Sequence, residues 1–409
     1  MADAATTRRE LFTDPRLVSV LSVTGVAVFS NQAAPVALPG ISRSLAVSDA
    51  QVGLVMTAFF LPASVMLLIV GSLADIYGRR TVVLPSLLVS GAAGVGIFFV
   101  DSFAALLALR VLQGAAFPAL TPLSTAIIGD LYEGPTGATA QGLRSSVNGL
   151  SGVLGPAFAG VLAGVAWQYP FLLSALVFPV ALVVYRYLPE TGGHAAGERP
   201  GLLAHLRDIG TEFVDSDLRL LAVGGGVIYF AKFAVVTFIP LFAVRELGAS
   251  AFAAGLLLSV RGLVRIFSAP LSGVAVERFA RRGALVGTLL LVAATVVLMP
   301  LAPAAVPGVP PLVVLGLLVG AYSAGEALFN PVLNDTVVGL ASDDRRAGVV
   351  NTISVFKNGA SAVSPAVLGL VLTATDFGAL FLLAAVVPVA YAALLLVRFD
   401  GGEAASTTG

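Results

Sequence analysis

Long apolar runs separated by short polar segments extend along almost the whole chain. Each run has about the ~20 residues that a helix needs to cross the ~30 Å hydrocarbon core of a bilayer at ~1.5 Å per residue. We delimit twelve runs, at residues 17–39, 50–70, 81–100, 103–128, 140–165, 170–188, 218–241, 251–275, 284–303, 311–338, 348–372 and 378–397. The pattern predicts an all-α integral membrane protein with twelve transmembrane helices.

A polar turn after the second run occurs a second time after the eighth. The first copy carries Gly71, Asp75, Gly78, Arg79 and Arg80. The second copy follows 202 positions later and carries Gly273, Glu277, Arg281 and Arg282, with Ala280 in the place of a glycine. Such a duplication is typical of transporters built from parallel repeats. We expect two pseudo-symmetric six-helix bundles, at residues 1–189 and 218–409.

The segment between the bundles, residues 190–217, is polar and predicts a cytoplasmic linker, with an amphipathic surface helix over residues 202–213.

The arginines of the loops indicate on which side of the membrane each loop lies. With the N-terminus in the cytoplasm, all loop arginines except Arg43 and Arg245 lie on the cytoplasmic side, as the positive-inside rule requires. We therefore expect a multi-pass protein of the plasma membrane with both termini in the cytoplasm.

Composition narrows the classes of function. Hydrophobic residues make up 57% of the chain, charged residues only 11%, and the net charge is zero, so nothing indicates binding to nucleic acid. The chain has no cysteine and two histidines, so we expect neither a disulfide, nor a metal site, nor a histidine-based hydrolase. No lysine follows a glycine, which excludes the ATP-binding phosphate loop. We expect a monomer without a cofactor, whose partners are the lipid bilayer and a small-molecule substrate.

Charged side chains inside the apolar runs are costly in lipid and by default mark a substrate pathway or cavity. The cations are Arg110, Arg144, Lys232, Arg261, Arg265 and Lys357, and the deep carboxylate is Glu326. They occur in runs 4, 5, 7, 8, 10 and 11, whereas runs 3, 6, 9 and 12 carry no charge apart from Arg186 at the cytoplasmic end of run 6. Both lysines of the chain belong to this set, and an ammonium group suits the binding of an anion or a change of protonation.

The turn from Gly71 to Arg80 resembles the loop between helices 2 and 3 of the major facilitator superfamily, whose pattern is roughly Gly-x-x-x-Asp-x-x-Gly-Arg-Arg/Lys. Through the duplication the resemblance covers the whole chain. It implies the twelve-helix fold of that family, with runs 3, 6, 9 and 12 facing lipid, and transport by alternating access. It also implies that both copies of the turn form a cytoplasmic gate, in which Asp75 contacts the opposite half near run 11.

Two further motifs resemble those of the same family. Arg110, Gln113 and Gly114 match a pattern, Arg-x-x-Gln-Gly, that is linked to proton coupling; an arginine that extends outward to the membrane surface is the alternative. The glycine–proline motif of the family's antiporter branch is matched in run 5 by Gly152, Gly155, Pro156 and Gly160. Ser151 and Ala159 replace two of its glycines, and ordinary packing of small residues is the alternative there.

Helical counting places Arg265 and Glu326 at a similar depth, ~21–23 Å from the outer ends of their runs, so we expect them to form an ion pair. Glu326 and Arg110 are the candidates for proton coupling. The full predicted substrate cavity consists of Asn31, Gln32, Arg110, Gln113, Arg144, Asn148, Lys232, Arg261, Arg265, Glu326, Asn330, Lys357 and Asn358.

These features favour a proton-coupled secondary active transporter of a small organic solute. The motif in run 5 favours antiport and efflux. The excess of cations over carboxylates in the interior supports an alternative, the symport or exchange of an organic anion. A membrane receptor without transport activity is a third class that the sequence leaves open.

Overall fold

The computed structural model describes residues 11, 13–192, 216–304, 307–340 and 346–399, and within these ranges it contains helices and no strand. The all-α prediction is confirmed. The chain divides into two compact units, which we describe separately: unit 1 comprises Met1–Val47 and Ala58–Arg199, and unit 2 comprises Ser48–Thr57 and Pro200–Gly409. The surface helix predicted over residues 202–213 lies outside the described residues.

Unit 1 contains most of the first half of the chain. Its elements are α2 (Pro15–Asn31), α3 (Ala33–Ser44), α4 (Asp49–Tyr77), α5 (Arg79–Ile97), α6 (Phe103–Ala116), η1 (Phe117–Ala119), α7 (Thr121–Leu131), α8 (Gly134–Ala163), η2 (Tyr169–Leu176) and α9 (Val177–Tyr187). Several of these join into one span each: α2 with α3, α6 with α7, and η2 with α9. Prolines lie in the first turns of η1 and α7, at the joints within the α6–α7 span, and in the first turn of η2, where its span begins; a missing backbone N–H is tolerated at such positions.

Unit 2 contains the first turns of α4 and the second half of the chain. Its other elements are α11 (Ser216–Glu246), α12 (Ala251–Ser268), η4 (Ala269–Leu271), α13 (Ser272–Leu298), η5 (Met299–Ala304), α14 (Pro311–Leu340), α15 (Arg346–Ala374) and α16 (Phe377–Arg398). The continuous helical stretch Ala251–Ala304 has 54 residues. Its length of about 80 Å is far more than one crossing needs, and a kink at Ala280 divides it into two spans. With the other ten candidate spans, the described part of the chain then contains the predicted twelve.

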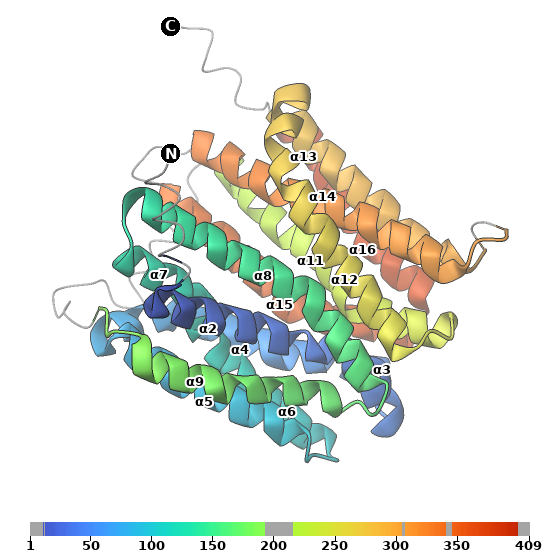
Figure 1. Ribbon diagram of the computed structural model, residues 1–409. Coiled ribbons are helices and arrows are strands. Elements are labelled where there is room, and N and C mark those ends of the chain that lie inside the picture. Colours follow the sequence, from blue (N-terminus) through green and yellow to red (C-terminus); the bar gives the residue numbers. More distant parts are fainter. Residues whose placement is uncertain (1–10, 12, 193–215, 305–306, 341–345, 400–409) are drawn as a thin grey trace, which may run out of the picture. The chain divides into compact units, whose positions relative to one another are not determined.

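The same helix pairs form in both units. In unit 1, α2 packs on α8 and α9, and α5 packs on α6 and α9 (Figure 1). In unit 2, α11 packs on α15 and α16, and α13 packs on α14 and α16. The order along the chain equates α2 with α11, α5 with α13, α6 with α14, α8 with α15 and α9 with α16. The duplication in the sequence is therefore also a duplication of packing.

The two polar turns repeat each other in backbone conformation. Gly78 has a φ of 94° and a ψ of 148°, and Ala280 has a φ of 55° and a ψ of 167°. This region of backbone space is essentially restricted to glycine, because a Cβ atom clashes with the neighbouring carbonyl. Unit 2 thus tolerates a strained alanine where unit 1 has glycine.

The arginines of the two turns also make equivalent contacts. Arg79 forms an ion pair with Asp130 at the end of α7, and Arg281 pairs with Asp335 near the end of α14 at 3.2 Å. Each following arginine donates to a carbonyl at the end of the last helix of its unit: Arg80 to Tyr185 at 2.7 Å and Arg282 to Leu396. Within each unit the turn therefore connects two other spans.

The start of α2 is held by a polar contact of its own. Asp14 caps the helix by accepting from the backbone N–H of Arg16 at 2.9 Å, and the hydroxyl of Tyr132 donates to its carboxylate at 2.7 Å. Burial disfavours the charged form of Asp14, but the hydrogen bonds from Arg16 and Tyr132 outweigh it and lower the pKa of the carboxyl group. This contact anchors the first span to the end of α7.

Replacement of Ala280 by glycine should stabilise unit 2 by about 1–2 kcal/mol, because glycine adopts this backbone conformation without strain. Ala275→Gly is the matched control. It lies in the same helix with helical backbone angles, so the same exchange should cost about 0.5–1 kcal/mol there. Thermal unfolding in detergent measures both changes, and a lower melting temperature for Ala280→Gly than for the unmodified protein would contradict the assignment of strain.

Candidate functional site

Charged residues from α11, α12, α14 and α15 come together inside unit 2. They are Lys232, Arg261, Arg265, Glu326 and Lys357, which we call the charged cluster. Lys232 interacts electrostatically with Glu326, Arg261 and Arg265, and Lys357 does so with Lys232 and Arg265. The sequence placed all five in the predicted cavity, and the structure brings these members of that set together.

An ion pair between Arg261 and Glu326 forms the buried part of the cluster. Arg261 Nε lies 3.2 Å from Glu326 Oε2, and Arg261 Nη2 lies 3.1 Å from both carboxylate oxygens. The side chain of Glu326 is 3% exposed and that of Arg261 15%. A forked guanidinium facing a carboxylate is among the strongest polar contacts in proteins, and burial strengthens it further.

The ion pair expected between Glu326 and Arg265 was therefore assigned to the wrong arginine. Counting residues from the helix ends assumes that α12 and α14 start at one level and run parallel. Arg261 precedes Arg265 by about one helical turn, so an error of one turn in relative level accounts for the difference. Arg265 is exposed and contributes to the cluster through its charge.

Tyr229 joins the two lysines. The Nζ atom of Lys232 lies 4.2 Å from the centre of the Tyr229 ring, and that of Lys357 lies 5.8 Å from it. Lys232 also lies 5.7 Å from the ring of Phe233. Such cation–π contacts stabilise an ammonium group in a place with little water. Sequence reasoning missed Tyr229, although its spacing of three residues from Lys232 on α11 could have indicated a shared helix face.

Tyr322 is the second residue that sequence reasoning missed. It is fully buried, one turn before Glu326 on α14, and interacts electrostatically with Glu326, Arg261 and Arg265. Among the described residues its hydroxyl has no hydrogen-bond partner. A tyrosine hydroxyl can both donate and accept a hydrogen bond, so Tyr322 adds a polar group beside the ion pair.

The predicted cavity residues of unit 1 form a separate set of contacts. Arg110 is 1% exposed, donates to Gln113 Oε1 at 3.0 Å, and lies 4.4 Å from the centre of the Phe59 ring. Its burial rules out the alternative of an arginine extended to the surface. Arg144 donates to Gln141 at 3.0 Å. The remaining amide residues of the prediction are Asn31, Gln32 and Asn148, which are half-buried.

Asn330 and Asn358 of unit 2 bind to their own helices. The side-chain nitrogen of Asn330 donates to the carbonyl of Glu326 at 3.2 Å, and that of Asn358 donates to the carbonyl of Ser354 at 2.8 Å. Asn330 thereby touches the backbone of the charged cluster at Glu326. The hydrogen bond of Asn358 to Ser354 stays within α15, and Asn358 is next to Lys357 in the sequence.

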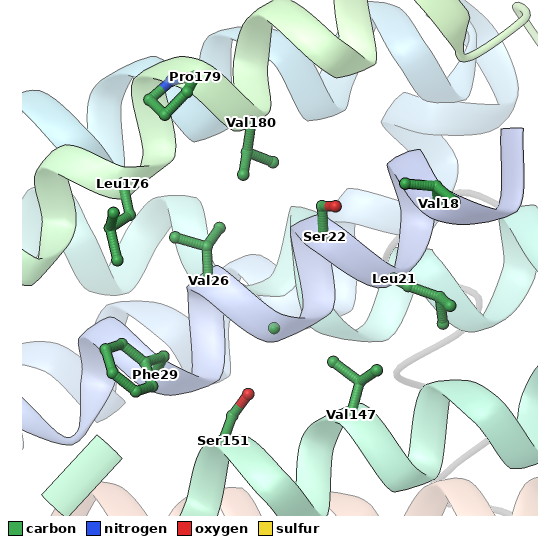
Figure 2. Close-up of a pocket in the computed structure, with 11 residues that line it drawn as sticks. Val18, Leu21, Ser22, Val26, Phe29, Val147, Ser151, Leu176, Pro179 and Val180 are labelled. Atoms are coloured by element: carbon green, nitrogen blue, oxygen red, sulfur yellow. The ribbon is translucent and has the colours of Figure 1, made fainter. Parts of the chain in front are cut away.

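An apolar cavity of about 540 Å³ lies in unit 1 between α2, α8, η2 and α9 (Figure 2). The hydroxyls of Ser22 and Ser151 are the only polar side-chain groups in its lining, and the lining contains no charge. Its volume is in the range of ligand pockets, but its chemistry suits only an apolar group. We place the candidate site at the charged cluster instead, because a charged group in the membrane interior needs a functional reason more than an apolar cavity does.

The run 5 motif divides into a packing position and an open position. A Cβ atom on Gly155 would lie 2.7 Å from Cγ of Gln32 and 3.3 Å from the carbonyl of Phe29, so α8 approaches α2 closely there. A Cβ atom on Gly152 would meet no atom within 4 Å. Close packing thus explains Gly155 and leaves Gly152 without a packing role in the described structure.

A membrane protein with two copies of one six-helix unit and charges within its spans is, as a class, a secondary transporter. The chain belongs to the Major Facilitator Superfamily, whose sequence profile matches residues 20–242 and 221–408. This confirms the predicted family, and its members are transporters and not enzymes.

Over 162 residues the chain is 32% identical to the Bacillibactin exporter of Bacillus subtilis, which corresponds to 38% of this chain and 40% of that protein. Over 128 residues it is 30% identical to the Multidrug transporter protein MdtP of the same organism, or 31% of this chain and 24% of that protein. The chain thus spans less than half of either relative. The nucleoside transporter NupG superposes with a TM-score of 0.77 over 95% of this chain and 99% of that chain, at 14% identity, which shows a shared fold.

Removal of one partner of the buried ion pair should be more harmful than removal of both. Arg261→Leu should lower stability by about 3–5 kcal/mol, because Glu326 is left as a buried charge without its partner. Arg261→Leu combined with Glu326→Leu should recover most of that loss. Arg265→Leu, on the same helix and exposed, is the control and should cost less than about 1 kcal/mol. Equal losses for Arg265→Leu and Arg261→Leu in thermal unfolding would restore the pairing predicted from the sequence.

The two glycines of the run 5 motif give a second matched pair. Gly155→Ala should lower the melting temperature, because its Cβ atom must displace Gln32. Gly152→Ala should be neutral or stabilising by up to about 1 kcal/mol, because alanine is the better helix former and has space. Equal melting temperatures for the two variants would argue against close α2–α8 packing as the reason for Gly155.

Proposed function

We propose that this chain is a proton-coupled exporter of a small organic solute that carries an anionic group, in the plasma membrane with both termini in the cytoplasm. It is a transporter of the Major Facilitator Superfamily and works by alternating access. The observation that carries the proposal is the buried Arg261–Glu326 pair with Lys232, Lys357 and Arg265 around it. Its two steps are a proton that binds Glu326 and an anion that binds the cations.

Glu326 suits the role of proton carrier because it is a carboxylate deep in a span and is held by one strong partner. When Glu326 is ionised, its negative charge balances the positive charge of Arg261. When a proton neutralises it, the charge of Arg261 loses its partner, and in a place of low dielectric that charge is costly. An anionic group of the substrate that binds Arg261 in place of the ionised carboxylate lowers this cost. Binding of a proton to Glu326 would thus favour binding of the anion to Arg261, a coupling that also suits symport of an organic anion with a proton.

The lysines suit the role of substrate ligands. Both ammonium groups lie over Tyr229, so an anion that approaches them meets two positive charges beside an aromatic face. Four cationic side chains and one carboxylate leave the cluster positive, which favours an anion over a cation. Efflux as the direction is supported by the run 5 motif and by the names of the two relatives, an exporter and a multidrug transporter. Symport or exchange of an organic anion is the second candidate and rests on the same positive cluster.

The polar turns suit the role of gate. In each unit the turn ties two other spans together through Arg79 and Asp130 or through Arg281 and Asp335. A turn held in this way can transmit a movement of one helix to its neighbours. We propose that the residues of both copies, with Asp75 as the contact to the opposite half, control access from the cytoplasm.

Glu326→Gln should abolish transport driven by a pH gradient in proteoliposomes and leave substrate exchange at equal pH intact. The amide keeps the shape of the side chain but cannot carry the proton. Glu246→Gln, the same exchange on an exposed residue at the end of α11, should leave both activities unchanged. Full accumulation under a pH gradient in Glu326→Gln would exclude Glu326 as the proton carrier.

Lys357→Ala should weaken binding of an anionic substrate about 10-fold to 100-fold, the worth of one charge-assisted hydrogen bond, and Lys357→Arg should weaken it less because the charge remains. The assay compares uptake of labelled organic carboxylates with growth protection against a panel of drugs. Undiminished transport of a purely cationic compound by Lys232→Ala and Lys357→Ala would favour a cationic drug as the substrate.

A further inference from the structure

The segment Leu188–Gly192, directly after α9, wraps around the turn between α4 and α5. The backbone N–H groups of Arg80 and Thr81 donate to the two carboxylate oxygens of Glu190, at 2.9 Å to Oε1 and 3.1 Å to Oε2. The hydroxyl of Thr81 donates to Oε2 at 2.8 Å. The N–H of Arg79 donates to the carbonyl of Thr191 at 2.8 Å.

These contacts give hydrogen-bond acceptors to the backbone N–H groups in the first turn of α5, and the acceptors come from a distant part of the chain. The first N–H groups of any helix lack partners inside the helix, and the side chain of the preceding residue normally accepts from the second or third of them. That preceding residue is Gly78, which has no side chain. Glu190, which lies more than a hundred positions away in the sequence, accepts from the second and third groups in its place. A negative charge at this end of a helix is also favoured by the helix dipole.

Gly78 is required here for two independent reasons. Its φ of 94° is unfavourable for any residue with a Cβ atom. In addition, a Cβ atom at this position would lie 2.4 Å from Cδ of Glu190. The glycine of the motif is therefore also the space into which the carboxylate fits.

We propose that Glu190 is a positioning residue for the polar turn: it caps α5 from outside the helix and fixes the turn to the chain segment that leads out of the first six-helix repeat. This rests on the proposed function of the turn as a gate. A turn held by Glu190 moves as one body with the end of α9. Loss of the carboxylate then lets the turn move independently, which slows the change between conformations but leaves the charged cluster intact.

The first test is hydrogen exchange of the full-length protein in detergent, measured on peptides that cover residues 79–84. Exchange of the Arg80 and Thr81 amides should be at least about tenfold faster in Glu190→Ala, which removes both acceptors, and intermediate in Glu190→Gln, which keeps one acceptor oxygen. Glu133→Ala is the control, because Glu133 precedes α8 without capping it through its side chain. Equal exchange in Glu190→Ala and Glu133→Ala would overturn the cap.

The second test asks whether Glu190 affects transport or only caps α5. In proteoliposomes Glu190→Ala should lower the maximal transport rate at least about threefold with unchanged KM, since the substrate site is unaffected, whereas Glu133→Ala should change neither. Faster amide exchange with an unchanged maximal rate would overturn the positioning role. If instead Asp75→Asn also leaves the maximal rate unchanged, the turn is not a gate and the proposed function of the turn fails, while the exchange result still decides whether Glu190 caps α5.

Discussion

The cost of placing a charge in hydrocarbon is the constraint on which the structure depends. Every span of this chain is apolar over most of its length, so each charge inside must find a partner within the protein. Glu326 forms an ion pair with Arg261, and both lysines make cation–π contacts with the ring of Tyr229. Arg110 donates a hydrogen bond to Gln113 and lies over the ring of Phe59. Helices without such charges need no partner and can face lipid. The distribution of charge thus marks the spans whose side chains need polar partners inside the protein.

A second constraint acts at the ends of the spans. A turn of a few residues must reverse the chain and leave few backbone groups without partners. Both repeats use the same solution: one residue in a conformation that glycine prefers, followed by two arginines that bind a carboxylate and a helix-end carbonyl. Because these contacts reach two other spans, the turn helps to define the order of helices within each unit.

Much of this could be predicted from the sequence, because hydropathy, the duplicated turn and the cations inside the spans are local features. The five members of the charged cluster were all identifiable in this way. The ion pair itself was missed by one helical turn, since the relative level of α12 and α14 depends on packing that residue counting does not contain. Tyr322 was missed because a tyrosine in an apolar run carries no charge to mark it. Glu190 was missed because its partners are distant in the sequence and are backbone groups, which every residue has.

The two units share their packing but not their interior chemistry. Unit 2 gathers four cations and a carboxylate in one place, whereas unit 1 has a buried arginine held by an amide and a ring, and an apolar cavity elsewhere. The contacts that repeat, such as the two arginine–aspartate pairs, lie at the span ends, and those that differ lie within the spans. A duplicated fold requires the former in both copies, because each copy must close its own turn. It places no such demand on the interior, where the two copies can differ in the number and kind of their charges. The interior charge of unit 2 is therefore better explained by function than by folding.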